Sequence, residues 1–182
     1  MRWPLAWSSR PSSAWLQRLP GRRIRLRDLL RAAERGLPAE AVVYDAGGGT
    51  GYPLRLFSAA EGGRSHRTYV LAEPQREMRD RAHRVAAVEG APEIRRVQAD
   101  GVALPFRDAS ADLVLSIGVL CCTAPEAVPR AIREIDRVLR RGGRLAFAVP
   151  RRHGAEMERL LMSGGFHIVE RVRRNRTLFE KG

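Results

Sequence analysis

Short apolar runs alternate with amphipathic segments along most of this chain. Runs rich in Val, Leu, Ile and Ala predict buried strands at 41–45, 68–72, 94–98, 112–117, 144–149, 166–171 and 176–179. Apolar side chains at every third or fourth position predict helices at 25–35, from the glycines near 47–51 to Gly62-Gly63, at 75–89, at 126–140 and at 154–163. Strand-like and helix-like patterns therefore mostly alternate from about residue 40 onward.

This order of elements predicts an α/β fold. Strands separated by helices form right-handed βαβ units, so we expect a mainly parallel, seven-stranded sheet with helices on both faces. The link Arg173-Arg174-Asn175 is too short for a crossover and predicts an antiparallel hairpin of the last two strands at one edge. Because no repeat or linker divides the chain, residues 25–182 are expected to form a single domain.

Residues 1–24 are expected to form a separate N-terminal arm. Their first 22 positions are rich in Arg, Ser and Pro and contain all three tryptophans, Trp3, Trp7 and Trp15. Two interpretations stay open: an arm whose aromatic side chains pack on the domain, and a lid over a ligand pocket.

The charge of the chain is its most unusual bulk property. A length of 182 residues and a hydrophobic fraction of 44% suit one ordinary domain, but the formal net charge of +13 suggests a nucleic-acid partner. All but one of the 33 basic residues are arginine, however, and many stand beside acids, as in Arg76-Glu77 and Arg79-Asp80. We therefore favour a solvated surface of mixed charge, and nucleic acid stays possible as a partner without being favoured.

The two cysteines are adjacent, Cys121-Cys122, without the spacing of a zinc site or a disulfide framework. We expect no metal site, and buried, reduced thiols are favoured over a reactive thiol. No apolar stretch approaches the roughly 20 residues that span a bilayer, and the N-terminus lacks the apolar core of a signal peptide. The sequence predicts a cytoplasmic protein without a membrane span and leaves its oligomeric state open.

A glycine-rich turn follows the first predicted strand. Asp45 ends that strand, and Gly47, Gly49 and Gly51 occupy alternate positions behind it. Glycines tolerate positive φ and let a ligand approach the main chain, while the next helix offers its N-terminal N–H groups. Two phosphate-binding motifs are excluded, because Tyr52 stands where a dinucleotide fingerprint needs its third glycine and no Gly-Lys-Ser/Thr is present.

Further polar or small residues follow the next strands, at the edge where open α/β sheets bind ligands. Glu73 ends the second strand and is placed to accept hydrogen bonds from a ribose diol. Asp100 follows the third strand, and Ser116-Ile117-Gly118 end the fourth. Each acid has an ordinary alternative, Glu73 as a cap of a helix beginning at Pro74 and Asp100 as a turn residue. Their joint placement behind successive strands favours a ligand site.

This series resembles the class I S-adenosylmethionine-dependent methyltransferases, in their small-molecule and quinone-biosynthesis branch, over nearly all of residues 40–150. The resemblance rests on Asp-x-Gly-x-Gly-x-Gly at 45–51, on Glu73, on Ala99-Asp100, and on the segments 103–106, 111–116 and 133–143. It implies a Rossmann-like class I methyltransferase fold and S-adenosylmethionine as the cofactor.

The resemblance also implies roles for single residues. Gly47 and Gly49 would press their backbone against the methionine and ribose portion of the cofactor, and Asp45 would lie near its ammonium group. Glu73 would hold both ribose hydroxyls, Asp100 the adenine amino group, and Val102 would cover the adenine face or supply a main-chain contact. The complete set of expected cofactor contacts is Asp45, Gly47, Gly48, Gly49, Thr50, Gly51, Glu73, Pro74, Asp100, Gly101, Val102, Ser116, Ile117 and Gly118.

Methyl transfer itself needs mainly an aligned acceptor, because the sulfonium is already activated. A general base helps where the acceptor carries a proton, and His153 after the fifth strand is the candidate catalytic residue. A surface histidine at the start of the next helix is the alternative. After the fourth strand many relatives carry a histidine or an aromatic pair, whereas this chain has Leu120-Cys121-Cys122-Thr123. This difference concerns the acceptor and not the cofactor.

The sequence thus favours in-line methyl transfer from S-adenosylmethionine to a small-molecule acceptor. Two alternatives stay open. One is an RNA-directed methyltransferase, suggested by the charge although no Asn-Pro-Pro-Tyr follows the fourth strand. The other is a non-catalytic S-adenosylmethionine-binding module, suggested by the unusual Cys-Cys segment.

Overall fold

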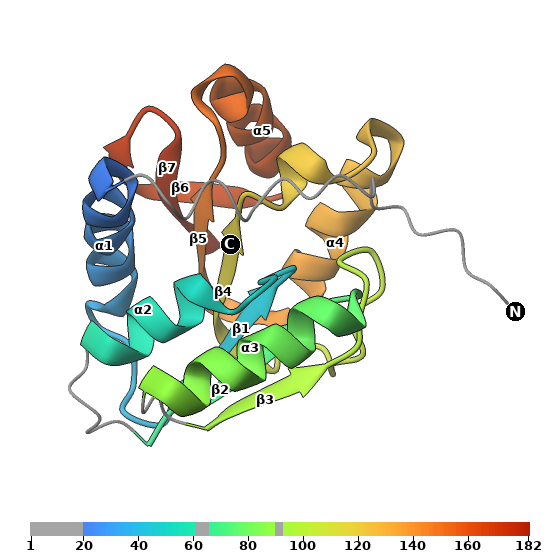
Figure 1. Ribbon diagram of the computed structural model, residues 1–182. Coiled ribbons are helices and arrows are strands. Elements are labelled where there is room, and N and C mark those ends of the chain that lie inside the picture. The colour runs from blue at the N-terminus through green and yellow to red at the C-terminus, as the bar shows by residue number, and fades with distance from the viewer. Residues whose placement is uncertain (1–19, 61–65, 90–92) are drawn as a thin grey trace, which may run out of the picture.

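The computed structural model describes residues 20–60, 66–89 and 93–182. Figure 1 shows helices on both sides of a central twisted sheet. Single-turn 3-10 helices are labelled η. In chain order the elements are α1 (Pro20–Glu34), β1 (Val42–Ala46), α2 (Tyr52–Ala60), β2 (Thr68–Ala72), α3 (Arg76–Glu89), β3 (Ile94–Val97), β4 (Ala111–Ile117), η2 (Leu120–Cys122), η3 (Pro125–Ala127), α4 (Val128–Val138), β5 (Leu139–Ala148), α5 (Arg151–Ser163), β6 (Phe166–Arg173) and β7 (Arg176–Lys181).

In the described part of the chain, seven strands form one sheet in the order β3-β2-β1-β4-β5-β7-β6. The pairs from β3 to β5 are parallel, and β7 is antiparallel to both β5 and β6. The mainly parallel α/β sheet and its C-terminal hairpin are therefore confirmed. The order of the strands reverses between β1 and β4, and open α/β sheets bind ligands at such a reversal.

Two hydrophobic cores lie on opposite faces of this sheet, because side chains alternate along each strand. One face packs against α1, α2 and α3, with Leu29 and Phe57 among its buried residues. The other face packs against α4 and α5, with Ile135 and Leu161. Helices on both faces are thus confirmed, and each core has its own helical layer (Figure 1).

The first and last helices begin earlier than the apolar pattern predicted. α1 begins at Pro20 instead of residue 25, and proline suits a first helical position because its missing N–H would have no partner there. α5 begins at Arg151 instead of residue 154. Arg151 and the two residues after it, Arg152 and His153, are polar, so the first turn has no apolar periodicity to reveal it. The other limits differ by one or two residues, apart from those of α4 and β5.

The predicted helix 126–140 is wrong at both ends. Its first turn is the 3-10 helix η3, and α4 ends at Val138 because Leu139 already has extended backbone angles (φ −71°, ψ 134°). Leu139 begins β5 and pairs with Ala111 of β4. The two glycines at 142–143 therefore make a bend inside a strand and do not cap a helix; the first of them has φ 69°.

Some sequence predictions concern residues outside the described ranges. The expected helix end at Gly62-Gly63 lies there, and so does the arm or lid as far as residue 19. Among the described residues, no helix combines the length and the apolar character needed to cross a membrane.

Candidate functional site

The turn between β1 and α2 is built from glycines in the left-handed region. Gly47, Gly49 and Gly51 have φ values of 79°, 57° and 70°, which residues with a Cβ adopt only at a cost. The Gly47 N–H donates to the carbonyl of Ala72 (2.8 Å), which fastens the turn to the end of β2. The Gly51 N–H donates to the Gly48 carbonyl (2.8 Å). The alternate glycines are thus needed to bend the main chain at the carboxyl edge of β1.

Gly48 is required for a different reason, which is lack of space. A Cβ on Gly48 would lie 2.3 Å from Oδ2 of Asp45 and 2.3 Å from Cδ1 of Leu71, closer than atoms can approach. The turn therefore passes directly over the Asp45 carboxylate.

Asp45 is a buried acid that lacks a hydrogen-bond partner in the described part of the chain. Its side chain is fully buried, and neither carboxylate oxygen accepts a hydrogen bond from any residue that the structure describes. The pKa of Asp45 is raised to about 8, mainly by burial and then by the negative charge of Glu73, while the Arg55 guanidinium acts in the opposite direction. Buried polar groups are nearly always hydrogen-bonded, so two fully buried acceptor oxygens without a partner among the described residues are unusual.

Glu73 holds the glycine turn and the approach to α3 together. Its side chain is 3% exposed; Oε2 accepts the Gly49 N–H (3.0 Å) and Oε1 accepts the Gln75 N–H (3.0 Å). Burial raises the pKa of Glu73 in spite of these two bonds. An ionised carboxylate has about four acceptor positions, so each oxygen can still accept one more hydrogen bond. The alternative of a cap on a helix beginning at Pro74 is wrong, because α3 begins at Arg76 and the Gln75 N–H lies before it. A ligand role for Glu73 stays open.

Asp100 begins the turn after β3. Its Oδ1 accepts the Val102 N–H (3.2 Å), and its carbonyl accepts the Ala103 N–H (3.0 Å). Asp100 is thus the turn residue that the ordinary alternative described. Its negative charge also contributes to the raised pKa of Glu73, which places the two acids in one electrostatic environment.

Three acids therefore lie at the carboxyl ends of three adjacent strands: Asp45 inside β1, Glu73 directly after β2 and Asp100 after β3. Asp45 pairs in register with Leu71, two residues before Glu73, so both acids point to the face that α1, α2 and α3 cover. Ser116 points to the opposite face, because its neighbour Leu115 belongs to the α1–α3 core. Ser116 is fully buried, and its Oγ has no hydrogen-bond partner among the described residues. The site thus gathers the acids around the glycine turn, and Ser116 lies apart from them.

The remaining predicted contacts surround this row without adding a charge. Gly118 has φ 76° and donates its N–H to the Ala148 carbonyl (2.7 Å), which joins the ends of β4 and β5. Among these predicted contacts, Thr50 is buried. Five are half-buried: Pro74, Gly101, Val102, Ile117 and Gly118.

Two arginines at the site were not identified from the sequence. Arg55, one turn into α2, is buried and donates to the Thr50 carbonyl. Arg79 of α3 donates to the carbonyls of Glu73 (2.7 Å) and Pro74 (2.8 Å). A basic residue one helical turn beyond an acid-lined loop is the only signal that the sequence offers, and it is common in a chain with so many arginines.

A clamp from α4 holds the loop after β3. Glu134 accepts the Leu104 N–H (2.8 Å), and Arg137 donates to the carbonyls of Leu104 (2.9 Å) and Phe106 (2.8 Å). Arg137 also pairs with Glu134 (2.9 Å) and with Asp108 (2.6 Å). The hydrogen bond from Arg137 lowers the pKa of Glu134. The segment that follows Asp100 and Val102 is therefore anchored by two side chains of α4, which lie 30 to 33 residues from their partners in sequence.

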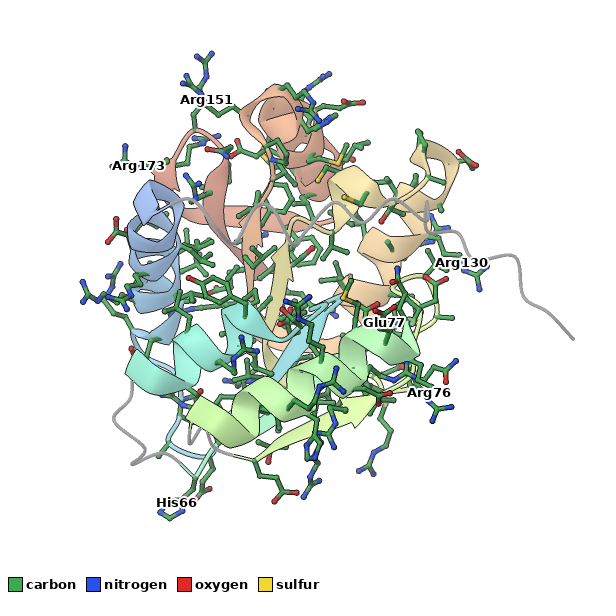
Figure 2. The ribbon with its side chains drawn as sticks, in the orientation of Figure 1. His66, Arg76, Glu77, Arg130, Arg151 and Arg173 are labelled. Atoms are coloured by element: carbon green, nitrogen blue, oxygen red, sulfur yellow. The ribbon has the colours of Figure 1, made fainter. Side chains whose placement is uncertain are left out.

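His153 lies in the first turn of α5, after the carboxyl end of β5. It is half-buried, and its Nε2 accepts the Nε–H of Arg152 (2.9 Å). His66 precedes β2 and is exposed; Figure 2 shows it at the opposite end of the view from Arg151, the first residue of α5. Of these two histidines, only His153 follows a strand at the carboxyl edge, and its catalytic role stays a prediction.

Comparisons with known proteins agree with this arrangement. A family model described as a methyltransferase domain matches residues 44–147. An uncharacterized methyltransferase of Mycobacterium sp. strain KMS is 41% identical over 120 residues, which cover 64% of this chain and 41% of that protein. The chain thus matches about two fifths of the length of this relative.

Solved structures show the same fold. A SAM-dependent methyltransferase from Aquifex aeolicus superposes with a TM-score of 0.71 at 19% identity, over 95% of this chain and 97% of that one. The [4+2]-cyclase SpnF superposes with a TM-score of 0.67 at 23% identity, over 90% of this chain and 63% of that one. Since the family model spans more than half of the chain, this protein belongs to the methyltransferase domain family, with the fold of the class I S-adenosylmethionine-dependent methyltransferases.

Proposed function

We propose that this protein transfers a methyl group from S-adenosylmethionine to a small-molecule acceptor. The observation that supports this most is the buried carboxylate of Asp45 beneath the glycine turn, which has no hydrogen-bond partner among the described residues. With Glu73 and Asp100 it forms a row of acids at adjacent strand ends. Such a row attracts a ligand with cationic groups and disfavours a pyrophosphate.

The residues present fit S-adenosylmethionine group by group. The cofactor has an ammonium, a sulfonium, a ribose diol and an adenine, and when bound it supplies an activated methyl group. Asp45 would accept from the ammonium, and Glu73 from the diol through the free position on each oxygen. Asp100 and Val102, in the turn after β3, would contact the adenine. Because two backbone N–H groups already hold Glu73, little side-chain freedom is lost when the diol binds.

The protein's share in catalysis is then mainly orientation. The ends of β4 and β5, with η2 and the first turn of α5, would position the acceptor for in-line displacement of the methyl group. His153 is the proposed general base for an acceptor that carries a proton. The roles of η2, α5 and His153 rest on their position at the carboxyl edge. For the predicted N-terminal arm, of which residues 20–24 belong to α1, packing on the domain and a lid over this side both stay open as proposals.

Glu73→Gln tests the cofactor assignment. Loss of one charged hydrogen bond costs about 1.5–3 kcal/mol, so affinity for S-adenosylmethionine should fall roughly tenfold or more in a calorimetric titration. The matched control is Glu156→Gln, which neutralises an exposed acid on α5 and should bind like the wild type. Equal affinity of Glu73→Gln and wild type would refute the diol role.

Turnover separates an enzyme from a binding module. Wild-type protein incubated with S-adenosylmethionine and a panel of small hydroxyl, amine and carbon acceptors should form S-adenosylhomocysteine with at least one of them. Failure to bind either nucleoside would refute the proposal as a whole. Binding without turnover across the panel would support the non-catalytic alternative.

A further inference from the structure

Cys121 and Cys122 form an open pair of thiols after β4. They occupy the 3-10 turn η2, both are half-buried, and their sulfur atoms lie 3.9 Å apart. They are the only cysteines in the chain. The sequence-based prediction of free thiols is confirmed, but full burial is not, since both side chains reach solvent.

The geometry of the pair disfavours a disulfide. Consecutive Cα atoms are about 3.8 Å apart across a trans peptide, whereas disulfides join Cα atoms roughly 4.4–6.8 Å apart. The sulfurs would also have to approach from 3.9 Å to about 2.0 Å. In addition, the hydrogen bond with Cys122 and then burial raise the pKa of Cys121, so its reactive thiolate form is disfavoured. The two thiols are therefore held side by side without being poised to join.

The same spacing suits one atom that bridges both sulfurs. An atom that binds each sulfur at about 2.3 Å with a near-tetrahedral angle separates the sulfurs by about 3.8 Å. A structural zinc ion would need four ligands, and no group of three or more His, Cys, Asp or Glu side chains in the described ranges is arranged for a metal. An atom that bridges the two sulfurs would therefore have only these two ligands from the described part of the protein.

We propose that Cys121 and Cys122 form a binding site for a trivalent arsenical, a thiophilic centre that needs only two protein sulfurs. Two arsenic–sulfur bonds form, the arsenic–oxygen bonds break, and the oxygen leaves as water with both thiol protons. Arsenic stays trivalent, so no oxidant is needed. A rotation about the Cα–Cβ bonds supplies the few tenths of an ångström by which a pyramidal centre draws the sulfurs together.

The site would lie beside the proposed acceptor side. Cys121 Sγ donates to the carbonyl of Gly118 (3.5 Å), and η2 contacts α5, where the charge of Arg152 acts on Cys121. The proposal does not depend on methyl transfer, because it concerns two thiols and not the row of acids.

Phenylarsine oxide is the probe that tests it. Intact-protein mass spectrometry should show one arsenical on the wild type, and Cys121→Ser and Cys122→Ser should each bind it roughly 10²- to 10⁴-fold more weakly, because the second bond is intramolecular. Because either substitution removes one of the two sulfurs, both variants should weaken binding alike. Wild-type affinity in either variant, or no binding by the wild type, would overturn the proposal.

A second measurement needs no variant. Thiol titration carried to completion should count two free thiols in the wild type and none after addition of one equivalent of phenylarsine oxide. A dithiol such as 2,3-dimercaptopropanol should restore both, and the same concentration of a monothiol should not. Release by the monothiol would show two independent cysteines and would contradict a shared site.

Discussion

At the scale of single residues, Asp45 is the feature that sets this protein apart from a plain α/β scaffold. A carboxylate that is fully buried, covered by a glycine turn and without a hydrogen-bond partner among the described residues is costly in the ligand-free state. Its cost appears in the pKa, raised to about 8. The proposed cofactor role would account for this cost, because a cationic ligand would use the ionised form.

Asp45→Asn should change how stability depends on pH. Below the ordinary value of 3.8, Asp45 is protonated in both folded and unfolded states. Between pH 3.8 and about pH 8, Asp45 ionises only in the unfolded state. The free energy of unfolding of the wild type therefore falls by about 1.4 kcal/mol per pH unit because of this group. In denaturant unfolding of the ligand-free protein, the free energy of unfolding of Asp45→Asn should therefore rise relative to that of the wild type as the pH increases from 4 to 8.

Glu156→Gln is the control for this pH series, and it should follow the wild type throughout. If the difference between Asp45→Asn and wild type stays constant between pH 4 and 8, Asp45 does not titrate with a raised pKa.

At the scale of elements, the site depends on parts of the chain far from it in sequence. The loop after β3 is held by Glu134 and Arg137 of α4, and the end of β5 is held by Asn175, whose side chain donates to the Val149 carbonyl. β5 begins at Leu139, directly after α4 ends at Val138, and it bends at residues 142–143. No separate loop therefore joins α4 to β5. These contacts place the carboxyl edge, although none of the residues faces the proposed cofactor.

Arg137→Met should loosen the loop after β3. The variant leaves the Leu104 and Phe106 carbonyls without their charged donor, and loss of such a bond costs about 1.5–3 kcal/mol. We expect a lower free energy of unfolding and weaker S-adenosylmethionine binding. Arg133→Met, an exposed position on the same helix, should match the wild type in both measurements. Unchanged stability of Arg137→Met would show that the clamp is not needed.

Alanine at the two glycines of β5 should separate backbone strain from crowding. Gly142 has φ 69° with nothing within 4 Å of an added Cβ, so Gly142→Ala should cost only the left-handed backbone strain, about 1–2 kcal/mol. At Gly143 a Cβ would lie 2.7 Å from the Arg140 carbonyl oxygen. Gly143→Ala should therefore lower the free energy of unfolding by more. The reverse order would contradict the bend.

At the scale of the whole molecule, the basic residues behind the net charge of +13 are spread along the chain and often stand beside acids. Ion pairs join distant segments, as in Arg35 with Glu170 and Arg140 with Asp112. Exposed arginines do meet at one place, since the hairpin turn beside Arg173 lies against the start of α5 at Arg151 (Figure 2). That place borders the proposed acceptor side.

A salt titration distinguishes a small-molecule acceptor from RNA. An RNA complex with about six phosphate contacts would lose about 10³-fold in affinity between 50 and 200 mM salt. For the proposed small-molecule enzyme, affinity for S-adenosylmethionine should change little over this range, and a random RNA oligonucleotide should bind weakly or not at all even at 50 mM. Tight, salt-dependent RNA binding would favour the RNA-directed alternative.

The sequence by itself determined the kind and order of nearly all elements and the residues of the glycine turn. Periodicity, glycine spacing and an acid at a strand end are local properties, so Asp45, Gly47, Gly49 and Glu73 could be identified before any contact was known. The alternation of apolar positions likewise predicted a sheet covered on both faces.

Only the tertiary structure decided the rest. In the structure β7 lies between β5 and β6, and Gly48 lies over the Asp45 carboxylate. Arg55 is buried, and the Gly49 N–H donates to Glu73, 24 residues away in sequence. Strand order, the space around a residue and the partner of a buried charge depend on segments that meet only after folding. A pattern along the chain does not show which distant segments come into contact. The contacts of Arg137 with the loop after β3 and the 3.9 Å distance between the two sulfur atoms are therefore known only from the structure.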